Sequence, residues 1–155
     1  VIEHLHNPYY VLSEINRVLK KRGILFISTP NIMNLKSRMR FLFEGTFDFY
    51  REPPLDQLTN SKEKDAHSHL FLYRIQELEY ALFKNSFEII DVFTSYLEPG
   101  ARALSFLLPI IKLQCYIKYC RSLRKGGIDF RRLHNIILSK DLLFGRHLVI
   151  KAIKK

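Results

Sequence analysis

The chain has 155 residues, of which 47% are hydrophobic and 13% aromatic, enough to bury the core of one domain and to exclude a disordered segment. Its only cysteines, Cys115 and Cys120, exclude a disulfide framework, lack the spacing of a CxxC zinc motif and indicate a reducing compartment. The net charge of +10 leaves nucleic acid, an anionic membrane and acidic small molecules open as partners.

The opening residues place polar, chemically active side chains directly after an apolar pair. Val1-Ile2 precedes Glu3-His4, and Asn7-Pro8 is a typical helix entry because Asn caps and Pro is tolerated in the first turn. A strand end, a polar turn and a helix make one repeat of a parallel α/β sheet. Ligands bind at the carboxyl ends of strands in such sheets, so we expect Glu3 and His4 to lie at a functional site.

A helix and a strand follow this turn. Apolar residues recur at steps of three and four and predict one apolar helix face, which Gly23 terminates. The members of this face are Val11, Leu12, Ile15, Val18 and Leu19. The apolar run Ile24-Leu25-Phe26-Ile27 then predicts a strand near residues 23–28, covered on both faces as in a parallel sheet.

Residues 31–74 are expected to form an insertion or lid. A connection of this length inside a compact domain seldom remains a slack loop. Within it, Asn34 to Phe43 predicts a short basic helix with Leu35, Met39 and Leu42 on one side.

Helical periodicity returns after this connection at Ile75, Leu78, Leu82 and Phe83. Asn85-Ser86 breaks the pattern, and the following apolar residues predict a strand near residues 87–94.

The last third of the chain predicts an apolar helix and a closing strand. Ala103 to Tyr119 is apolar and helical in pattern, with Pro109 expected to interrupt it, and a basic stretch follows up to Arg132. The strand is expected near residues 147–153. Residues 99–141 are therefore expected to form a helical cap.

These residues together resemble the carboxyl-terminal half of the class I S-adenosylmethionine-dependent methyltransferases (type 11/23-like). The turn Glu3-His4-Leu5, the helix ending in Gly23 and the strand ending in Pro30-Asn31 are similar to the family's fourth strand, its helix and the fifth strand. His69, Leu72-Tyr73, Glu77-Leu78 and Ser86-Phe87 are similar to its later segment, with Ser86 where a Gly is usual. Leu142 to Val149 resembles the closing strand of members found with saccharide and surface-polymer synthesis.

The resemblance implies a Rossmann-like α/β methyltransferase sheet, truncated to its strands from the end of the fourth to the seventh, with a helical insertion and cap. Residues 1–155 would be the carboxyl-terminal part of a single domain. The family's glycine-rich first turn and the acidic residue that holds the cofactor ribose are not in the sequence, and its glycines form no GxGxG. We therefore expect that this chain alone does not bind the cofactor, and that an unpaired sheet edge makes it poorly soluble.

The resemblance also assigns residues to the site. Some members carry an ExxEH motif and a later His, which hold a divalent ion such as Mg²⁺ that polarises the acceptor hydroxyl. Glu3, His4 and His69 match this set, and they are the candidate catalytic and metal-binding residues, with His67 as the alternative to His69. Carboxylate and imidazole suit such ions, and a bound cation stabilises a developing alkoxide.

Two further readings of Glu3-His4 stay open: a general base or substrate contact, and structural packing. His4 and Leu5 are the candidate cofactor-binding residues. Pro30, Asn31 and His67 are the candidate substrate-binding residues, and for Pro30-Asn31 a simple strand-terminating turn is nearly as well supported. His134 and His147 are expected to be structural.

The function implied is O-methylation of a hydroxyl on a small molecule or on a glycan or lipid precursor, with S-adenosylmethionine as donor, in the cytoplasm. The alternative is a non-catalytic, membrane-peripheral or partner-binding module. Ala103 to Arg132 fits an anionic membrane surface, although a cap packed over the sheet is the favoured interpretation. No uninterrupted apolar run reaches the roughly 20 residues of a membrane span, and nucleic-acid binding is not expected because no recognition motif accompanies the basic residues.

Overall fold

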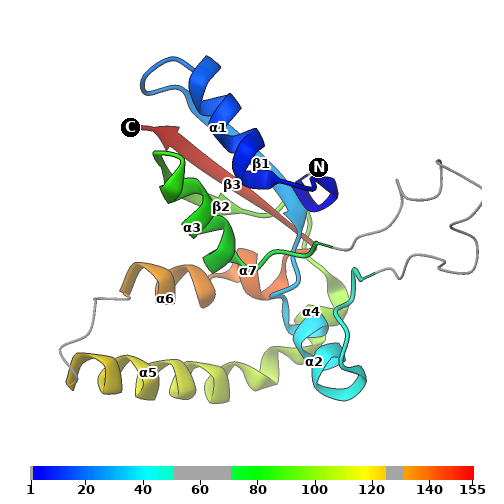
Figure 1. Cartoon of the computed structure of the whole chain (residues 1–155). Helices are drawn as coiled ribbons and strands as arrows, with labels where there is room; N and C mark the ends of the chain where they lie inside the picture. Colours follow the sequence, from blue (N-terminus) through cyan, green and yellow to red (C-terminus); the bar gives the residue numbers. More distant parts are fainter. Residues whose placement is uncertain (1, 51–70, 125–130) are drawn as a thin grey trace, which may run out of the picture.

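The computed structural model describes residues 2–50, 71–124 and 131–155 (Figure 1). They form a mixed α/β structure with a small antiparallel sheet, two helices on one of its faces and a group of helices at one of its ends.

The sheet has three strands, β1 (Ile24–Pro30), β2 (Phe87–Phe93) and β3 (His147–Lys154), and all three were predicted. Their order is β1-β3-β2, and β3 runs antiparallel to both neighbours. Ile150 stands opposite Ile27 on one side and Val92 on the other. Because both outer strands oppose β3, β1 and β2 run in the same direction and their carboxyl ends meet at one edge.

The expectation that the opening apolar pair ends a strand is wrong for Ile2. Ile2–His4 forms a short 3₁₀ helix, η1, and the backbone N–H of Leu5 donates to the carbonyl of Ile2 at 3.2 Å. A strand needs a neighbouring backbone to pair with, and β1 pairs only with β3 among the described residues. A single 3₁₀ turn satisfies the carbonyl locally instead.

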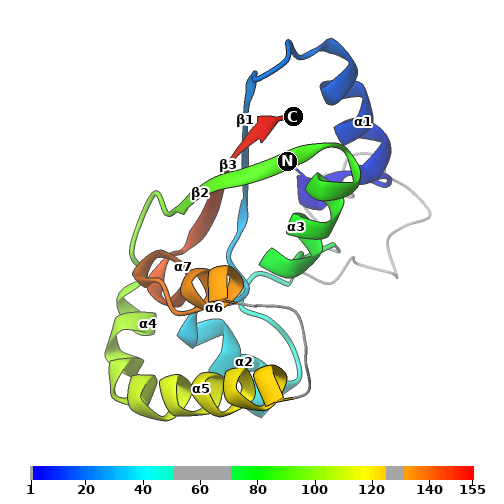
Figure 2. The ribbon, with the colours of Figure 1, turned by 90° about the vertical axis from the view of Figure 1, so that its left-hand side faces the viewer.

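Helices α1 (Pro8–Val18) and α3 (Ile75–Lys84) cover one face of the sheet (Figure 2). As predicted, Asn7 begins α1, since its side chain accepts a hydrogen bond from the backbone N–H of Tyr10 at 3.0 Å. The helix ends at Val18, before Gly23, because Leu19 is already extended.

The main core lies between this helix pair and the sheet. It joins η1, both helices, all three strands and Leu142 of α7, and its other fully buried members include Ile75, Leu82, Phe87 and Ile150. Val18 and Phe83 were predicted on apolar helix faces but are exposed. Each lies in the last turn of its helix. Phe83 directly follows the buried Leu82, and a step of one residue along a helix rotates the side chain by about 100°.

The opposite face of the sheet is open in the described residues. Ile24, Phe26 and Ile90 are exposed there, because no described helix lies over them. The prediction that the strand at residues 23–28 is covered on both faces is therefore wrong for the described part of the chain.

A group of helices gathers at the edge where β1 ends (Figure 1). A second, smaller core of Leu35, Ala101 and Leu143 joins three of them. The group consists of α2 (Leu35–Glu44), α4 (Pro99–Ala103), the 3₁₀ helix η4 (Leu104–Leu107), α5 (Leu108–Arg124), α6 (Arg131–Ile137) and α7 (Lys140–Phe144).

Two sequence predictions can be compared within this group. Helix α2 is confirmed, with the side chain of Asn34 accepting from the N–H of Ser37 at 2.9 Å. Pro109 lies in the first turn of α5, directly after the 3₁₀ helix η4, so the α-helical run is interrupted just before this proline. The helical run Pro99–Ser122 is apolar enough to cross a membrane by length and composition alone, and no part of its 18-residue window is buried.

Candidate functional site

The Glu3-His4 pair lies in η1, beside the carboxyl-terminal half of β1 (Figure 1). Glu3 is 7% exposed, whereas the side chain of His4 is about a third exposed. The distance between Nε2 of His4 and Oε1 of Glu3 is 3.9 Å. A buried carboxylate thus stands next to an imidazole that solvent and a ligand can reach.

The charge of Glu3 follows from its surroundings. Burial acts to raise the pKa of Glu3, whereas a backbone hydrogen bond and the charge of the neighbouring His4 ring act to lower it. A carboxylate in this position can hold an imidazole in one orientation and stabilise it when it takes up a proton.

A cavity of about 280 Å³ adjoins η1, between the start of α1 and α3. Ile2, Tyr9, Tyr73 and Glu77 are among its lining residues. Burial, with Tyr9 and Glu77 beside it, raises the pKa of Tyr73, so its phenol keeps its proton and can donate a hydrogen bond. Leu5, the other predicted cofactor contact, packs against the main core.

Glu77 also caps α3. Its Oε2 accepts the backbone N–H of Arg74 at 2.8 Å, and its Oε1 accepts Nε of Arg74 at 3.0 Å. Burial acts to raise the pKa of Glu77, but these hydrogen bonds and the charge of Arg74 lower it. Both oxygens of the Glu77 carboxylate accept hydrogen bonds from Arg74, and these bonds hold the side chain in place in the wall of the cavity.

Pro30 and Asn31 lie at the carboxyl end of β1, and both are buried. The side-chain amide of Asn31 donates to the carbonyls of Leu142 and Gly145, both at 2.9 Å, and its Oδ1 accepts the N–H of Met33 at 3.0 Å. These bonds join the end of β1 to α7. The side-chain hydrogen bonds of Asn31 therefore stabilise the conformation of the chain at this edge of the sheet.

Sequence reasoning missed a cluster of charges at the same edge. Glu98 is only 9% exposed, and its two carboxylate oxygens lie 3.6 Å from Nζ of Lys36 and 3.4 Å from Nη1 of Arg146. Lys36 also pairs with Asp48 at 3.1 Å. These residues are far apart in the sequence and form no spaced motif, so no sequence signal identifies the cluster.

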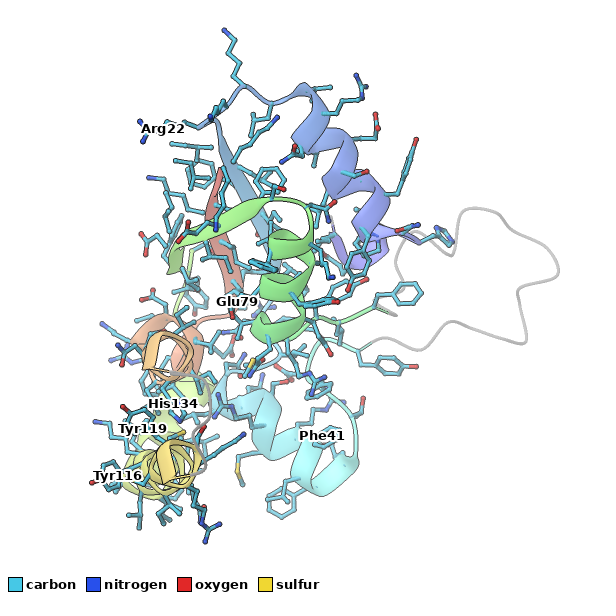
Figure 3. The ribbon with its side chains drawn as sticks, turned by 60° about the vertical axis from the view of Figure 1, so that its left-hand side comes forward. Arg22, Phe41, Glu79, Tyr116, Tyr119 and His134 are labelled. Carbon is cyan, nitrogen blue, oxygen red and sulfur yellow. The ribbon has the colours of Figure 1, made fainter. Side chains whose placement is uncertain are left out.

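The proposed metal set remains a prediction. His67 and His69 lie outside the described residues, and within residues 2–50, 71–124 and 131–155 no group of three His, Cys, Asp or Glu side chains is placed to hold a metal ion. His134 has the structural role expected of it, since its Nε2 lies 3.0 Å from the carbonyl of Cys115 and its ring packs edge-on against Tyr119 (Figure 3).

Two of the described glycines are enclosed by the chain itself. The position of a β-carbon is filled by Leu19 at Gly23, and by Asp141 and Thr94 at Gly145, so both glycines serve the chain's own packing, whereas that position is open at Gly45. Gly45 terminates α2 with a φ of 71°, in the left-handed region.

Neither a protein-family model nor a curated protein matches the chain.

Proposed function

We propose that the chain forms the acceptor side of an S-adenosylmethionine-dependent methyltransferase that methylates a hydroxyl group of a small molecule or of a glycan or lipid precursor. The observation that carries this proposal is the position of the Glu3-His4 pair. It lies beside the carboxyl-terminal half of β1, a strand whose carboxyl end shares one edge of the sheet with that of β2, and open α/β sheets bind ligands at such an edge.

Two features of the fold support the resemblance on which the proposal rests. A last strand that runs antiparallel between two strands of common direction is also the arrangement of the family's final strands. Ser86, where the family has a Gly, adopts a φ of 58°, in the left-handed region that favours glycine.

In this proposal the chain's own residues act on the acceptor. The imidazole of His4 accepts the hydroxyl proton, and the carboxylate of Glu3 orients the ring and stabilises its charged form. S-adenosylmethionine, when bound, supplies the methyl group, and none of the described residues is assigned to hold it.

A metal-assisted version of the same proposal assigns Glu3, His4 and His69 to a divalent cation. Removing the ion with a chelator would then abolish transfer, whereas transfer through the His4 base alone would continue in chelator. The two versions differ in this single measurement.

The experiment that tests the proposal measures transfer of tritiated methyl groups to hydroxyl acceptors by the chain joined to the coding sequence directly upstream of it. We expect His4→Gln to lower kcat by about 10²- to 10⁴-fold, the usual contribution of a general base, with an unchanged KM for the donor. His6→Gln is the matched control, because His6 is exposed two residues away. Equal activity of the His4 and His6 variants would contradict the proposal.

A further inference from the structure

Helix α5 exposes apolar side chains on the side that faces away from the rest of the molecule. Ile111 and Cys115 are half-buried on its inner side, whereas Ile110, Leu113 and Tyr116 are each about 60% exposed. Figure 3 shows the same division, with Tyr119 next to His134 and Tyr116 pointing outward. Only one side of α5 therefore packs against other described residues, while the other side leaves apolar side chains exposed.

Basic side chains border this apolar stripe. On a helix of 3.6 residues per turn, Lys112 lies to one side of Leu113 and Arg121 to the other, and both are exposed. Neither forms an ion pair with any described residue. The sequence has no acidic residue between Glu98 and Asp129, so nothing in this stretch neutralises them.

The apolar surface continues onto the end of α2, which lies along the same edge of the molecule as α5 (Figure 1). Phe43 and Leu42 are 77% and 70% exposed there, and Phe106 of η4 is 69% exposed. We name this surface the α2–α5 face. It consists of Phe41, Leu42, Phe43, Phe106, Ile110, Leu113 and Tyr116.

A groove of about 480 Å³ opens within the α2–α5 face, and one of its lining side chains, Arg38, is positively charged. Its lining is apolar except for Arg38, whose Nε donates to the carbonyl of Met33 at 2.6 Å. Nη2 of Arg38 is buried and has no hydrogen-bond partner among the described residues. A guanidinium in apolar surroundings favours an anionic oxygen such as that of a phosphate group.

We propose that the α2–α5 face docks on an anionic lipid bilayer, with its apolar side chains among the acyl chains and the exposed Lys112 and Arg121 near the headgroup phosphates. Anionic bilayers bind protein surfaces that expose apolar side chains bordered by basic ones. A second copy of the chain is a poorer occupant, because two such faces would bring their basic borders together. This inference does not depend on the proposed methyltransferase activity.

The chain has no tryptophan, so a single introduced one reports its own surroundings. We expect the fluorescence of Leu113→Trp to shift to shorter wavelength with vesicles of mixed phosphatidylcholine and phosphatidylglycerol, and not with phosphatidylcholine alone. Phe83→Trp is the matched control. Phe83 is also exposed, and Nζ of Lys155 lies 5.9 Å from the centre of its ring, but it belongs to α3.

Co-sedimentation with the same vesicles tests the charges. Each basic residue near an anionic surface strengthens binding by several-fold, so we expect Lys112→Glu combined with Arg121→Glu to weaken it at least about tenfold. Leu113→Glu should weaken it as well, and raised salt should release the wild-type chain. Circular dichroism and melting temperature confirm that these variants, all at exposed positions, remain folded.

Four outcomes would overturn the proposal. The first is that the wild-type chain binds neutral vesicles as strongly as anionic ones. The second is that the variant with Lys112→Glu and Arg121→Glu binds as strongly as the wild type. The third is that the membrane-bound chain resists carbonate extraction, which indicates a spanning helix. The fourth is a dimer in light scattering that Leu113→Glu abolishes without any vesicle binding, which indicates a second copy as the occupant. A shift for Leu113→Trp alone, lost with charge reversal, supports bilayer docking whether or not methyl transfer is found.

Discussion

The sheet with α1 and α3 differs from the group of helices at its end in how each part is held together. The first is stabilised by one continuous apolar core that joins three strands, two helices and Leu142 of α7. The second has a small core of three buried residues, and buried polar side chains such as Asn31, Asn34 and Glu98 connect its segments. The difference indicates that apolar burial contributes more to the stability of the sheet than to that of the helical end.

The largest expected effect is in the main core. Ile150 is fully buried in the central strand, so Ile150→Ala should lower the free energy of unfolding by about 2–5 kcal/mol. Chemical denaturation measures this loss.

Leu35→Ala, in the smaller core, should loosen α2 and α4 first, which hydrogen exchange detects as lost protection in the helical end alone. Equal loss of protection across the sheet would contradict the division into two parts.

A smaller but still large effect is expected at the junction of the two parts. Asn31→Ala removes three hydrogen bonds and leaves two buried carbonyls without this donor, which should cost about 2–3 kcal/mol. Thermal unfolding measures the loss. Asn135→Ala, at an exposed position, is the matched control and should be close to neutral.

Ser86 offers a change in the opposite direction. Its φ of 58° strains a residue with a β-carbon, and glycine relieves this strain. Glycine also gives the unfolded chain more conformational entropy, which opposes the gain, so Ser86→Gly should stabilise the chain by a net value of about 0.5–1 kcal/mol. A rise in melting temperature would bear this out. Ser13→Gly, in the middle of α1, should destabilise instead, since glycine is unfavourable in a helix.

The smallest effect is expected from pH. The pKa of Glu77 is lower in the folded chain than in the unfolded one, so its contribution to stability is present above the ordinary value of about 4.3 and is lost as pH falls through the folded value. Glu77→Gln should remove this part of the acid dependence. Identical melting curves of both proteins against pH below neutrality would show that the Arg74–Glu77 pair contributes nothing.

The sequence predicted the elements whose signals are local. Asn7-Pro8 and Asn34 begin helices as their capping chemistry requires, and the three strands lie where short apolar runs occur. The open sheet face was not predictable, because the run from Ile24 to Ile27 is apolar at every position whether one face or both are covered. The break expected at Pro109 lies just before it, where the 3₁₀ helix η4 gives way to α5 at Leu108.

The candidate site was predictable only in part. Glu3 and His4 are adjacent in sequence and needed no fold to bring them together. The hydrogen bonds of Asn31 reach residues more than a hundred positions away, and Glu98 meets Lys36 and Arg146 only through the packing of α2, α4 and the start of β3. Contacts of this kind carry no spacing that a single sequence reveals.

The most direct test of the central claim is calorimetric binding of S-adenosylmethionine to residues 1–155 alone and to the same chain preceded by the coding sequence upstream. We expect no measurable binding to the chain alone, because the glycine-rich turn and the acidic residue that hold the cofactor in the similar family are not in its sequence, and binding once the upstream residues are joined. Micromolar binding to residues 1–155 alone, or none to the joined protein, would contradict it.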